Sequence, residues 1–288
     1  MLWKLPDIKL APDVIATPWG FPITNTLLCT WITIILLAVV CYLGTRRRDM
    51  IPSGLQNFVE WGVESLLKLV NQVVGGNREK AKRFFPLVAT FFIFILFANL
   101  LDVIPGVDTI GTISDPVAQS HALFGFLLVD YNYSNHVIPW IRPATSDLNL
   151  TLAMALVSVI TTQAFGFYTL GAKTHLSKYF NFRGPVDFFV GIVEIISEAA
   201  RIISFSFRLF GNIFAGSAVL AVFAFVLPFF ADIAFIPLEL FIAFMQALVF
   251  AMLTLVFMEI ATSSHVVAES EYEAHKEYEQ KEVKSAAH

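Results

Sequence analysis

The sequence has little charge for its length. Only 15% of its 288 residues are charged and 57% are hydrophobic, whereas soluble domains carry about 25% charged and 45–50% apolar residues. The mean hydropathy of +0.70 and the 29 phenylalanines point the same way. This composition excludes an ordinary soluble protein and indicates a chain that resides in a membrane.

Cysteine is scarce, and a secretory signal peptide is lacking. Cys29 and Cys41 lie in the first apolar run, about 18 Å apart along a helix, whereas a disulfide requires Cα atoms within about 7 Å. We therefore interpret both as small apolar residues without a bridge inside that helix. Residues 1–20 contain three prolines and two aspartates but no short apolar core, so we expect the first apolar run to remain as a membrane helix.

Five apolar runs are long enough to cross a bilayer, since a membrane helix needs about 20 apolar residues. They are Ile23–Leu43, Phe84–Ile104, Leu148–Leu170, Phe188–Leu227 and Ile236–Ala261. We expect Pro228 and Pro237 to bracket the turn between the last two runs. The predicted fold class is all-α: a polytopic membrane protein of about five membrane helices.

The distribution of Lys and Arg predicts the orientation of these helices. The segments 45–83 and 172–187 contain eight and three such residues, whereas 102–147 has only Arg142 against five aspartates. The positive-inside rule then places the N-terminus outside and the C-terminus inside. We predict a single membrane domain over residues 1–288, with an outer N-terminal segment 1–23, membrane helices and loops over 24–262, and an inner charged tail over 263–288.

The fourth apolar run is too long for an upright helix. If Pro185–Leu227 is one helix, it extends about 65 Å, against a hydrocarbon core of about 30 Å. Such a helix must incline steeply or bend. Together with the last run, it predicts a long tilted helical hairpin in the C-terminal half, built around another curved object in the membrane.

Three further segments are predicted to be surface helices. In Leu55–Val74 the apolar residues recur at helical spacing, which favours a helix lying on the bilayer, with a docking face for a partner as the alternative. Ala118–Asp130 is apolar but too short to cross a membrane, and we expect a surface helix there. The acidic stretch Glu269–Glu282 is predicted to be a solvated helix.

Arg208 is the residue with the strongest functional signal. No acidic residue lies within nine positions of it on either side, and an arginine at membrane depth costs at least about 2.5–3.5 kcal/mol. Its guanidinium stays charged at physiological pH, so it cannot relay protons but can hold a fixed positive field against a carboxylate. The alternative, an arginine reaching to the interface, fits poorly with apolar sequence on both sides.

Two sets of polar residues flank Arg208 at different depths. Along the same helix, a stripe at helical spacing runs back through Ser204, Ser197 and Glu194, and Glu194 lies about 21 Å before Arg208 toward the inner side. Within this stripe Glu198 and Arg201 are spaced to form an ion pair.

The second set points outward. Asn212 follows Arg208 by one turn, and on the last helix Glu239 and Gln246 are seven residues apart and share a face. Glu239 could also be a carboxyl that merely sits at the interface. Two offset polar paths separated by a fixed cation are typical of a membrane protein that must not let ions pass through a continuous pore.

The run Ser204–Gly216, with the sequence SFSFRLFGNIFAG, resembles the signature of subunit a of F-type ATP synthases. Further segments agree in order over about residues 15–265: PSGLQNFVE at 52–60, NLLDVIPG at 99–106, TSDLNLTL at 145–152 and QALVF at 246–250. One departure concerns Ser217, at a position where many members carry Glu, His or Lys, which leaves Glu239 as the titrating group of that pair.

The resemblance implies roles for individual residues. Arg208 would be the essential arginine that faces the carboxylates of the c-subunit ring. The inner half-channel would contain Glu194, Ser197 and Ser204. The outer half-channel would contain Asn212, Glu239 and Gln246, with Asp147 and Asn149 at its mouth.

The implied function is that of a proton-translocating stator subunit in the membrane sector of an F-type ATP synthase. A proton would enter from outside, ride almost a full turn on a ring carboxylate and leave through the inner half-channel. Expected partners are the c-subunit ring, b-type peripheral stalk subunits, the lipid bilayer and the translocated protons, with no nucleic acid, cofactor or metal and no catalysis by this chain alone. The expected location is a bacterial plasma membrane, with the C-terminus cytoplasmic.

Two other classes of protein fit the sequence less well. A secondary transporter would carry its own substrate site, but the sequence has no internal repeat. A structural scaffold leaves Arg208 unexplained.

Overall fold

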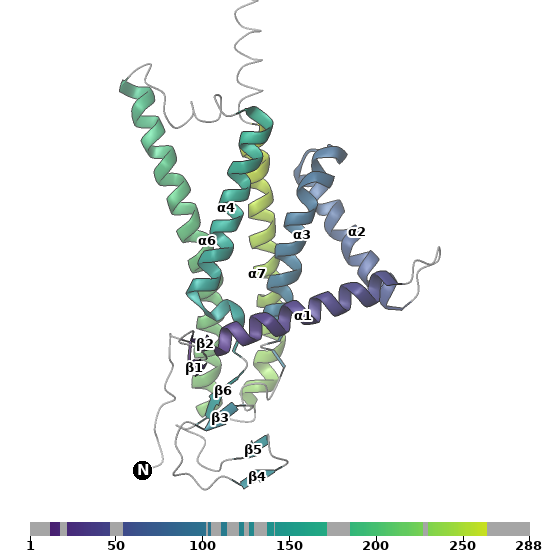
Figure 1. Ribbon diagram of the computed structural model, residues 1–288, viewed down its shortest axis with the longest axis vertical. Coiled ribbons are helices and arrows are strands. Elements are labelled where there is room, and N and C mark those ends of the chain that lie inside the picture. The colour runs from purple at the N-terminus through teal and green to yellow at the C-terminus, as the bar shows by residue number, and fades with distance from the viewer. Residues whose placement is uncertain are drawn as a thin grey trace, which may run out of the picture.

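The computed structural model is almost entirely helical (Figure 1). It describes residues 12–17, 22–46, 54–101, 103–104, 111–113, 121–123, 127–129, 137–140, 142–171, 185–226 and 230–263. The helices are α1 (Asn25–Arg46), α2 (Leu55–Val73), α3 (Arg78–Leu100), α4 (Leu148–Leu170), α6 (Pro185–Val226) and α7 (Phe230–Ser263), with a 3-10 turn η3 (Ala144–Ser146) before α4.

Short strands form three antiparallel pairs outside the helices, and the sequence analysis did not anticipate them. They pair β1 (Val14–Ala16) with β2 (Ile23–Thr24), β3 (Gly111–Ile113) with β6 (Val137–Pro139), and β4 (His121–Leu123) with β5 (Leu127–Val129).

The predicted membrane helices are present as helices. In the described part of the chain, α1, α3, α4 and the Phe235–Thr262 part of α7 are long and apolar enough to cross a membrane. The helix α3 begins six residues before its apolar run because Asn77 caps it, accepting hydrogen bonds from the amides of Glu79 and Lys80, both at 3.2 Å. The helix α6 is continuous over 42 residues.

Two predictions about local structure were wrong. The helix α7 passes through Pro237, which therefore does not border the turn; proline removes one backbone donor, a loss that membrane helices tolerate when neighbours compensate. The segment Ala118–Asp130 contains the hairpin β4–β5, with Ala122 opposite Leu128, in place of a surface helix. Gly125, at its centre in the sequence, is a poor helix former. The predicted tail helix Glu269–Glu282 lies outside the described residues.

The helices α3, α4, α6 and α7 lie roughly alongside one another, and α1 runs across their direction (Figure 1). The helix α3 packs against α7, and α4 packs against both α6 and α7. One core cluster joins α2 and α3 to α7 around Val70, Val88 and Leu255, and a second joins α3, α4, α6 and α7 around Ile95, Leu209 and Ala247. The second cluster lies directly behind Arg208 on α6.

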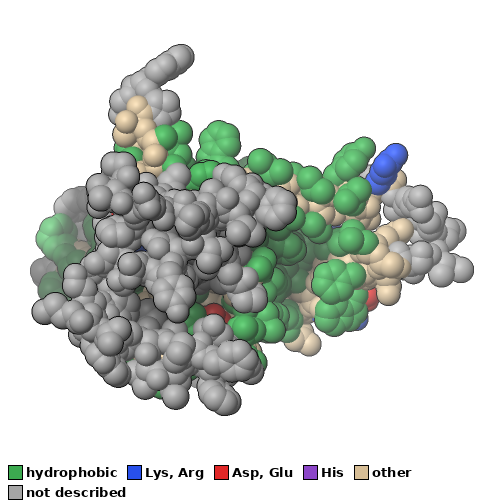
Figure 2. All heavy atoms as spheres, turned by 90° about the horizontal axis from the view of Figure 1, so that it is seen from below, with side chains coloured by type: hydrophobic (Ala, Val, Ile, Leu, Met, Phe, Trp, Pro, Cys, Tyr) green, Lys and Arg blue, Asp and Glu red, His purple; other side chains and the backbone are tan. Residues whose placement is uncertain are grey.

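The strands gather at one end of the bundle, where α1 and α4 begin (Figure 1). Polar bonds close this end: Asn25 donates to the carbonyl of Pro139 at 3.3 Å, and the Thr26 hydroxyl donates to the Asp147 carboxylate at 3.1 Å. Seen from this end, hydrophobic side chains cover most of the part that extends beyond the grey residues (Figure 2). On α1, Trp31 and Tyr42 are both 64% exposed, as a surface in contact with lipid requires.

Candidate functional site

Arg208 lies on the exposed face of α6. Its helical neighbours Phe205, Ser206 and Leu209 are buried against the bundle, whereas Phe207 is exposed like Arg208 itself. The guanidinium donates to the Ser204 hydroxyl one turn earlier, at 3.5 Å. Within the described part of the chain it forms no ion pair. The fixed charge is therefore presented outward, on an otherwise apolar surface.

A cavity of about 500 Å³ lies between α6 and α7 beside Arg208. Four of the residues singled out in the sequence line it: Arg208, Asn212, Glu239 and Gln246. The rest of its wall is apolar, with Val219, Phe235, Leu238 and Ile242 among the lining residues. The fold thus brings the cation and the three residues of the expected outer path into one space.

Asn212 and Gln246 connect the two helices of the hairpin. The Asn212 amide donates to the Gln246 side-chain carbonyl at 2.7 Å. Gln246 is 5% exposed, and its own amide nitrogen is buried without a partner among the described residues. Because buried amide donors are almost always satisfied, this nitrogen marks a place for a water molecule or a partner group.

A second, smaller cavity lies behind the first and reaches α3. Its volume of about 20 Å³ is enough for one water molecule. Polar groups of Asn99, Asn212, Ser217 and Glu239 line it. Asn99 is 1% exposed; its carbonyl oxygen accepts the Thr145 hydroxyl, and its amide nitrogen has no partner in the described residues. The site therefore has a polar wall on a third helix.

The sequence analysis assigned no role to Asn99. The available signal was an amide inside the apolar run Phe84–Ile104, since polar groups at membrane depth are costly and usually functional.

The residues of the expected inner path follow α6 away from the cavity. Glu194 is half-buried, and the hydroxyl of exposed Ser197 donates to the Val193 carbonyl at 2.8 Å. The predicted pair is confirmed, because Arg201 donates to Glu198 at 3.0 Å. The Arg201 guanidinium also lies 3.7 Å from the ring centroid of Phe257 on α7. Ser204 reaches Arg208, whereas Glu194 and Ser197 stay remote from it along the helix.

Asp147 and Asn149 lie at the start of α4 and line neither of these two cavities. Asp147 caps the helix, because one carboxylate oxygen accepts from the Asn149 amide at 2.9 Å and the other from Thr26. Both carboxylate oxygens of Asp147 therefore accept structural hydrogen bonds, at the end of the bundle where the strands lie.

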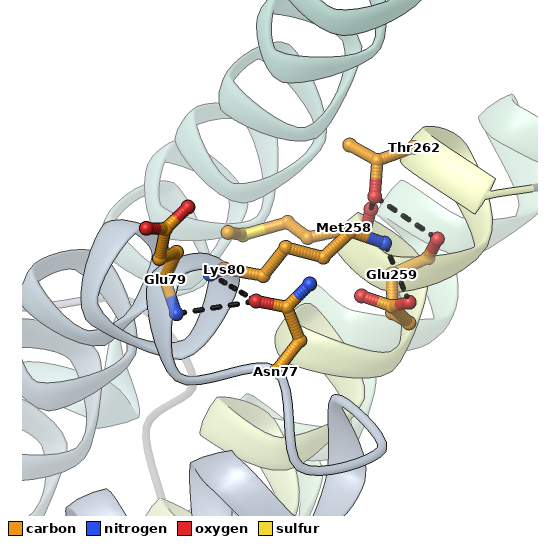
Figure 3. A network of polar contacts seen from close by, with 6 residues as sticks. All are labelled: Asn77, Glu79, Lys80, Met258, Glu259 and Thr262. Carbon is orange, nitrogen blue, oxygen red and sulfur yellow. Dashed lines mark hydrogen bonds and ion pairs between the residues drawn. The ribbon is translucent and has the colours of Figure 1, made fainter.

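At the opposite end, α3 and α7 are joined by an ion pair (Figure 3). The ammonium group of Lys80 lies 3.1 Å from the Glu259 carboxylate, beside the Asn77 cap of α3. In the last turn of α7, the Thr262 hydroxyl donates hydrogen bonds to the carbonyls of Met258 and Glu259. Glu259 therefore acts here as a structural partner of Lys80.

Comparison with known proteins shows which sequences this chain is similar to. Residues 27–259 match the sequence model of the family described as ATP synthase A chain. The chain is 30% identical over 244 residues to ATP synthase subunit a of Moorella thermoacetica, an alignment covering 85% of this chain and 93% of the relative. It is 32% identical over 232 residues to ATP synthase subunit a 1 of Syntrophotalea carbinolica, covering 79% and 81%. It is 29% identical over 239 residues to ATP synthase subunit a of Trichlorobacter lovleyi, covering 82% and 86%.

Proposed function

Because this chain belongs to the ATP synthase A chain family, the non-catalytic, proton-translocating subunit of the membrane sector, we propose how its residues carry the proton. Arg208 faces the carboxylates of a c-subunit ring, one half-channel leads to it from the outer side, and a second leads away to the inner side. The observation that carries this proposal is the exposed guanidinium on an apolar helix face, beside a cavity that contains a carboxyl group.

Arg208 separates the two half-channels. A permanently charged guanidinium attracts an ionised carboxylate, so a ring carboxylate that arrives beside it releases its proton before passing. The N-terminal half of α6 offers an apolar surface for such a ring on the face of Arg208, because Val190 and Val193 share that face and are exposed. This apolar surface suits a neighbouring membrane helix.

The outer half-channel runs through the two cavities. Glu239 lines both of them, and Asn212 and Gln246 stand between Glu239 and Arg208. Ser217 cannot titrate near neutral pH, so we assign the proton-carrying step there to Glu239 and to a water molecule held by the unpaired amide of Asn99. Asp147 and Asn149 stand at the outer mouth.

The inner half-channel follows the stripe of Ser204, Ser197 and Glu194 along α6. These residues lie in the N-terminal half of α6, the half that diverges from α4 in Figure 1, so the stripe would be completed by the ring and by water. It would lead to the basic loops that the positive-inside rule places on the inner side.

The proposed setting is a bacterial plasma membrane. The Lys and Arg distribution supports an outer N-terminus and a cytoplasmic C-terminus, and the ends of the helices that this scheme assigns to the outer side gather with the strands in Figure 1. Besides the ring and the bilayer, b-type stalk subunits are the expected partners. The exposed face of α2, with Phe58 and Trp61, suits either the bilayer surface or such a subunit.

Replacement of Arg208 tests the proposal. Vesicles containing the whole complex with Arg208→Ala are expected to lose ATP synthesis driven by a proton gradient, while the complex assembles in normal amounts. Arg208→Lys is expected to fail as well, because a compact ammonium lacks the planar fork. Lys82→Ala, at an exposed position outside the cavity, is the control. Wild-type synthesis by Arg208→Ala would contradict the assignment.

A secondary transporter is the other class to exclude. Purification of the chain with a c-subunit ring and stalk supports the proposal, whereas a monomer or simple dimer supports a transporter.

A further inference from the structure

The helix α4 carries small polar side chains on the face turned into the bundle. Thr151, Ser158 and Thr162 recur at helical spacing, and each is at most 1% exposed. A hydroxyl group buried in a membrane bundle has no bulk water to bond, so its partners must be protein groups. Two of these three hydroxyls form hydrogen bonds to other helices.

The first interhelical bond joins α4 to the helix that carries Arg208. The hydroxyl oxygens of Thr151 and Ser206 are 3.2 Å apart. Thr151 donates its own proton to the Leu148 carbonyl at 3.1 Å, so Ser206 is the donor in this pair. Ser206 is fully buried and lies two residues before Arg208, on the opposite side of the same helical turn.

The second bond joins α4 to α7. The hydroxyl oxygens of Ser158 and Thr254 are 2.8 Å apart. Thr254 donates to the Phe250 carbonyl at 2.9 Å, so Ser158 is the donor. With the Asn212–Gln246 bond between α6 and α7, each pair among the three helices is tied by one side-chain hydrogen bond.

Apolar packing also joins these helices near Arg208. The ring of Phe205 lies 5.2 Å from that of Phe250 and 5.7 Å from that of Phe257. Apolar packing tolerates small rotations and slides, whereas a hydrogen bond weakens steeply once its distance and angle depart from a narrow range. Any rotation of α6 moves the outward-pointing Arg208 guanidinium sideways along the surface that faces a partner.

We propose that the pairs Thr151–Ser206 and Ser158–Thr254 are positioning residues that fix the rotation and height of Arg208 while the ring moves past it. The inference rests on the proposed function of Arg208. A moving ring pulls on α6 through its exposed face, and α4, which is bonded to both helices of the hairpin, resists that pull. The two hydrogen-bonded pairs therefore affect coupling most when the load that opposes rotation of the ring, set by the ratio of ATP to ADP, is greatest.

The test removes hydroxyls in the whole complex: Thr151→Val puts a methyl group of similar size in place of the hydroxyl, and Ser206→Ala deletes it. Thr151→Val, Ser206→Ala and the double variant are compared in vesicles at a fixed proton gradient and rising ratio of ATP to ADP. An interhelical hydrogen bond in a membrane bundle contributes about 0.6 kcal/mol on average, which corresponds to roughly a threefold change in an equilibrium constant. We therefore expect the amount of ATP made per proton to fall roughly threefold at the highest ratio of ATP to ADP. At the lowest ratio each assembled complex should perform like wild type, and the double variant should lose no more than either single one.

Thr162→Val is the matched control, because this buried hydroxyl bonds only the Ser158 carbonyl of its own helix. It should behave like wild type at every load. Thr151→Ser, which keeps the hydroxyl, should restore coupling.

Three outcomes overturn the proposal: a defect that is independent of load, an equal defect in Thr162→Val, or failure of both Thr151→Val and Thr151→Ser to assemble. None of them concerns Arg208 itself, whose replacement abolishes synthesis at every load if the proposed function holds.

Discussion

At the scale of single residues, the position of a side chain on its helix separates functional from structural roles. Arg201 and Arg208 lie on the same helix, yet Arg201 is paired with Glu198 and stacked on Phe257. Arg208 is exposed and, among the residues that the structure describes, has only the long bond to Ser204. The sequence identified Arg208 because it lacks acidic neighbours. Burial adds that the charge lies on the exposed face of α6 and at the edge of the cavity between α6 and α7.

Glu239 and Glu194 are expected to respond to opposite sides of the membrane. Glu239→Gln should slow proton flux several-fold and shift its dependence on the outside pH, because a neutral amide cannot exchange protons with the outer water. Glu194→Gln should shift the dependence on the inside pH. The measurement is flux through reconstituted complexes with the two pH values varied independently. An identical response of both variants to both sides would refute the assignment of these carboxyls to separate half-channels.

Asn99 is expected to contribute to proton entry through its amide nitrogen. Asn99→Leu removes this donor and the small polar cavity beside Glu239, so entry from the outer side should slow by up to about tenfold, because a lost hydrogen bond costs about 0.5–1.5 kcal/mol and about 1.4 kcal/mol is a factor of ten. Thr145→Val is the control, since it removes the same side-chain bond but leaves the amide in place. Equal slowing in the two variants would assign Asn99 to structure alone.

At the scale of helices, the ends of the bundle are held by polar contacts and its middle mainly by packing. The cap of α3, the pair Lys80–Glu259 and the bond between Thr26 and Asp147 all lie near helix ends (Figures 1 and 3). The middle contains the two aromatic and aliphatic clusters. Polar groups at the ends can exchange partners with water, so their net contribution to stability is small.

The pair Lys80–Glu259 should show a modest coupling between α3 and α7. Its side chains are 36% and 22% exposed, so a double-mutant cycle with Lys80→Ala and Glu259→Ala should give about 0.5–1 kcal/mol in the free energy of unfolding. The comparison pair, Lys68 with Glu64 on α2, is about twice as exposed or more and should give about 0.3–0.5 kcal/mol. The measurement is thermal unfolding in detergent, and equal values for the two pairs would show that burial does not strengthen the first.

Much of the helical structure could be predicted from apolar run length, because α4 has the predicted bounds and α6 is one helix. The errors arose where backbone bonding decides the structure. Helix α3 begins at a cap outside its apolar run, and α7 continues through Pro237. The segment around Ala122 pairs as strands. The site residues on α6 and α7, between positions 204 and 246, were identified from their spacing. The place of Asn99 in the site depends on a contact between helices that are far apart in the sequence.

At the scale of the whole molecule, the orientation in the membrane can be tested with single cysteines. In a Cys29→Ala, Cys41→Ser background, Val14→Cys should react with an impermeant maleimide in intact cells, because β1 belongs to the outer segment. Arg78→Cys, at the exposed start of α3, should react only in inverted vesicles. The positive-inside rule gives both expectations, and labelling of Arg78→Cys in intact cells would reverse the topology.

The length of α6 makes the geometry of the molecule sensitive to lipid. A helix of 42 residues measures about 63 Å, so one that crosses a core of about 30 Å end to end inclines by roughly 60° from the normal. Its two ends are then separated by about 55 Å in the membrane plane, and each ångström of added thickness shortens that separation by about half an ångström. Under the proposed function, acyl-chain length therefore adjusts the sideways distance between the mouths of the two half-channels.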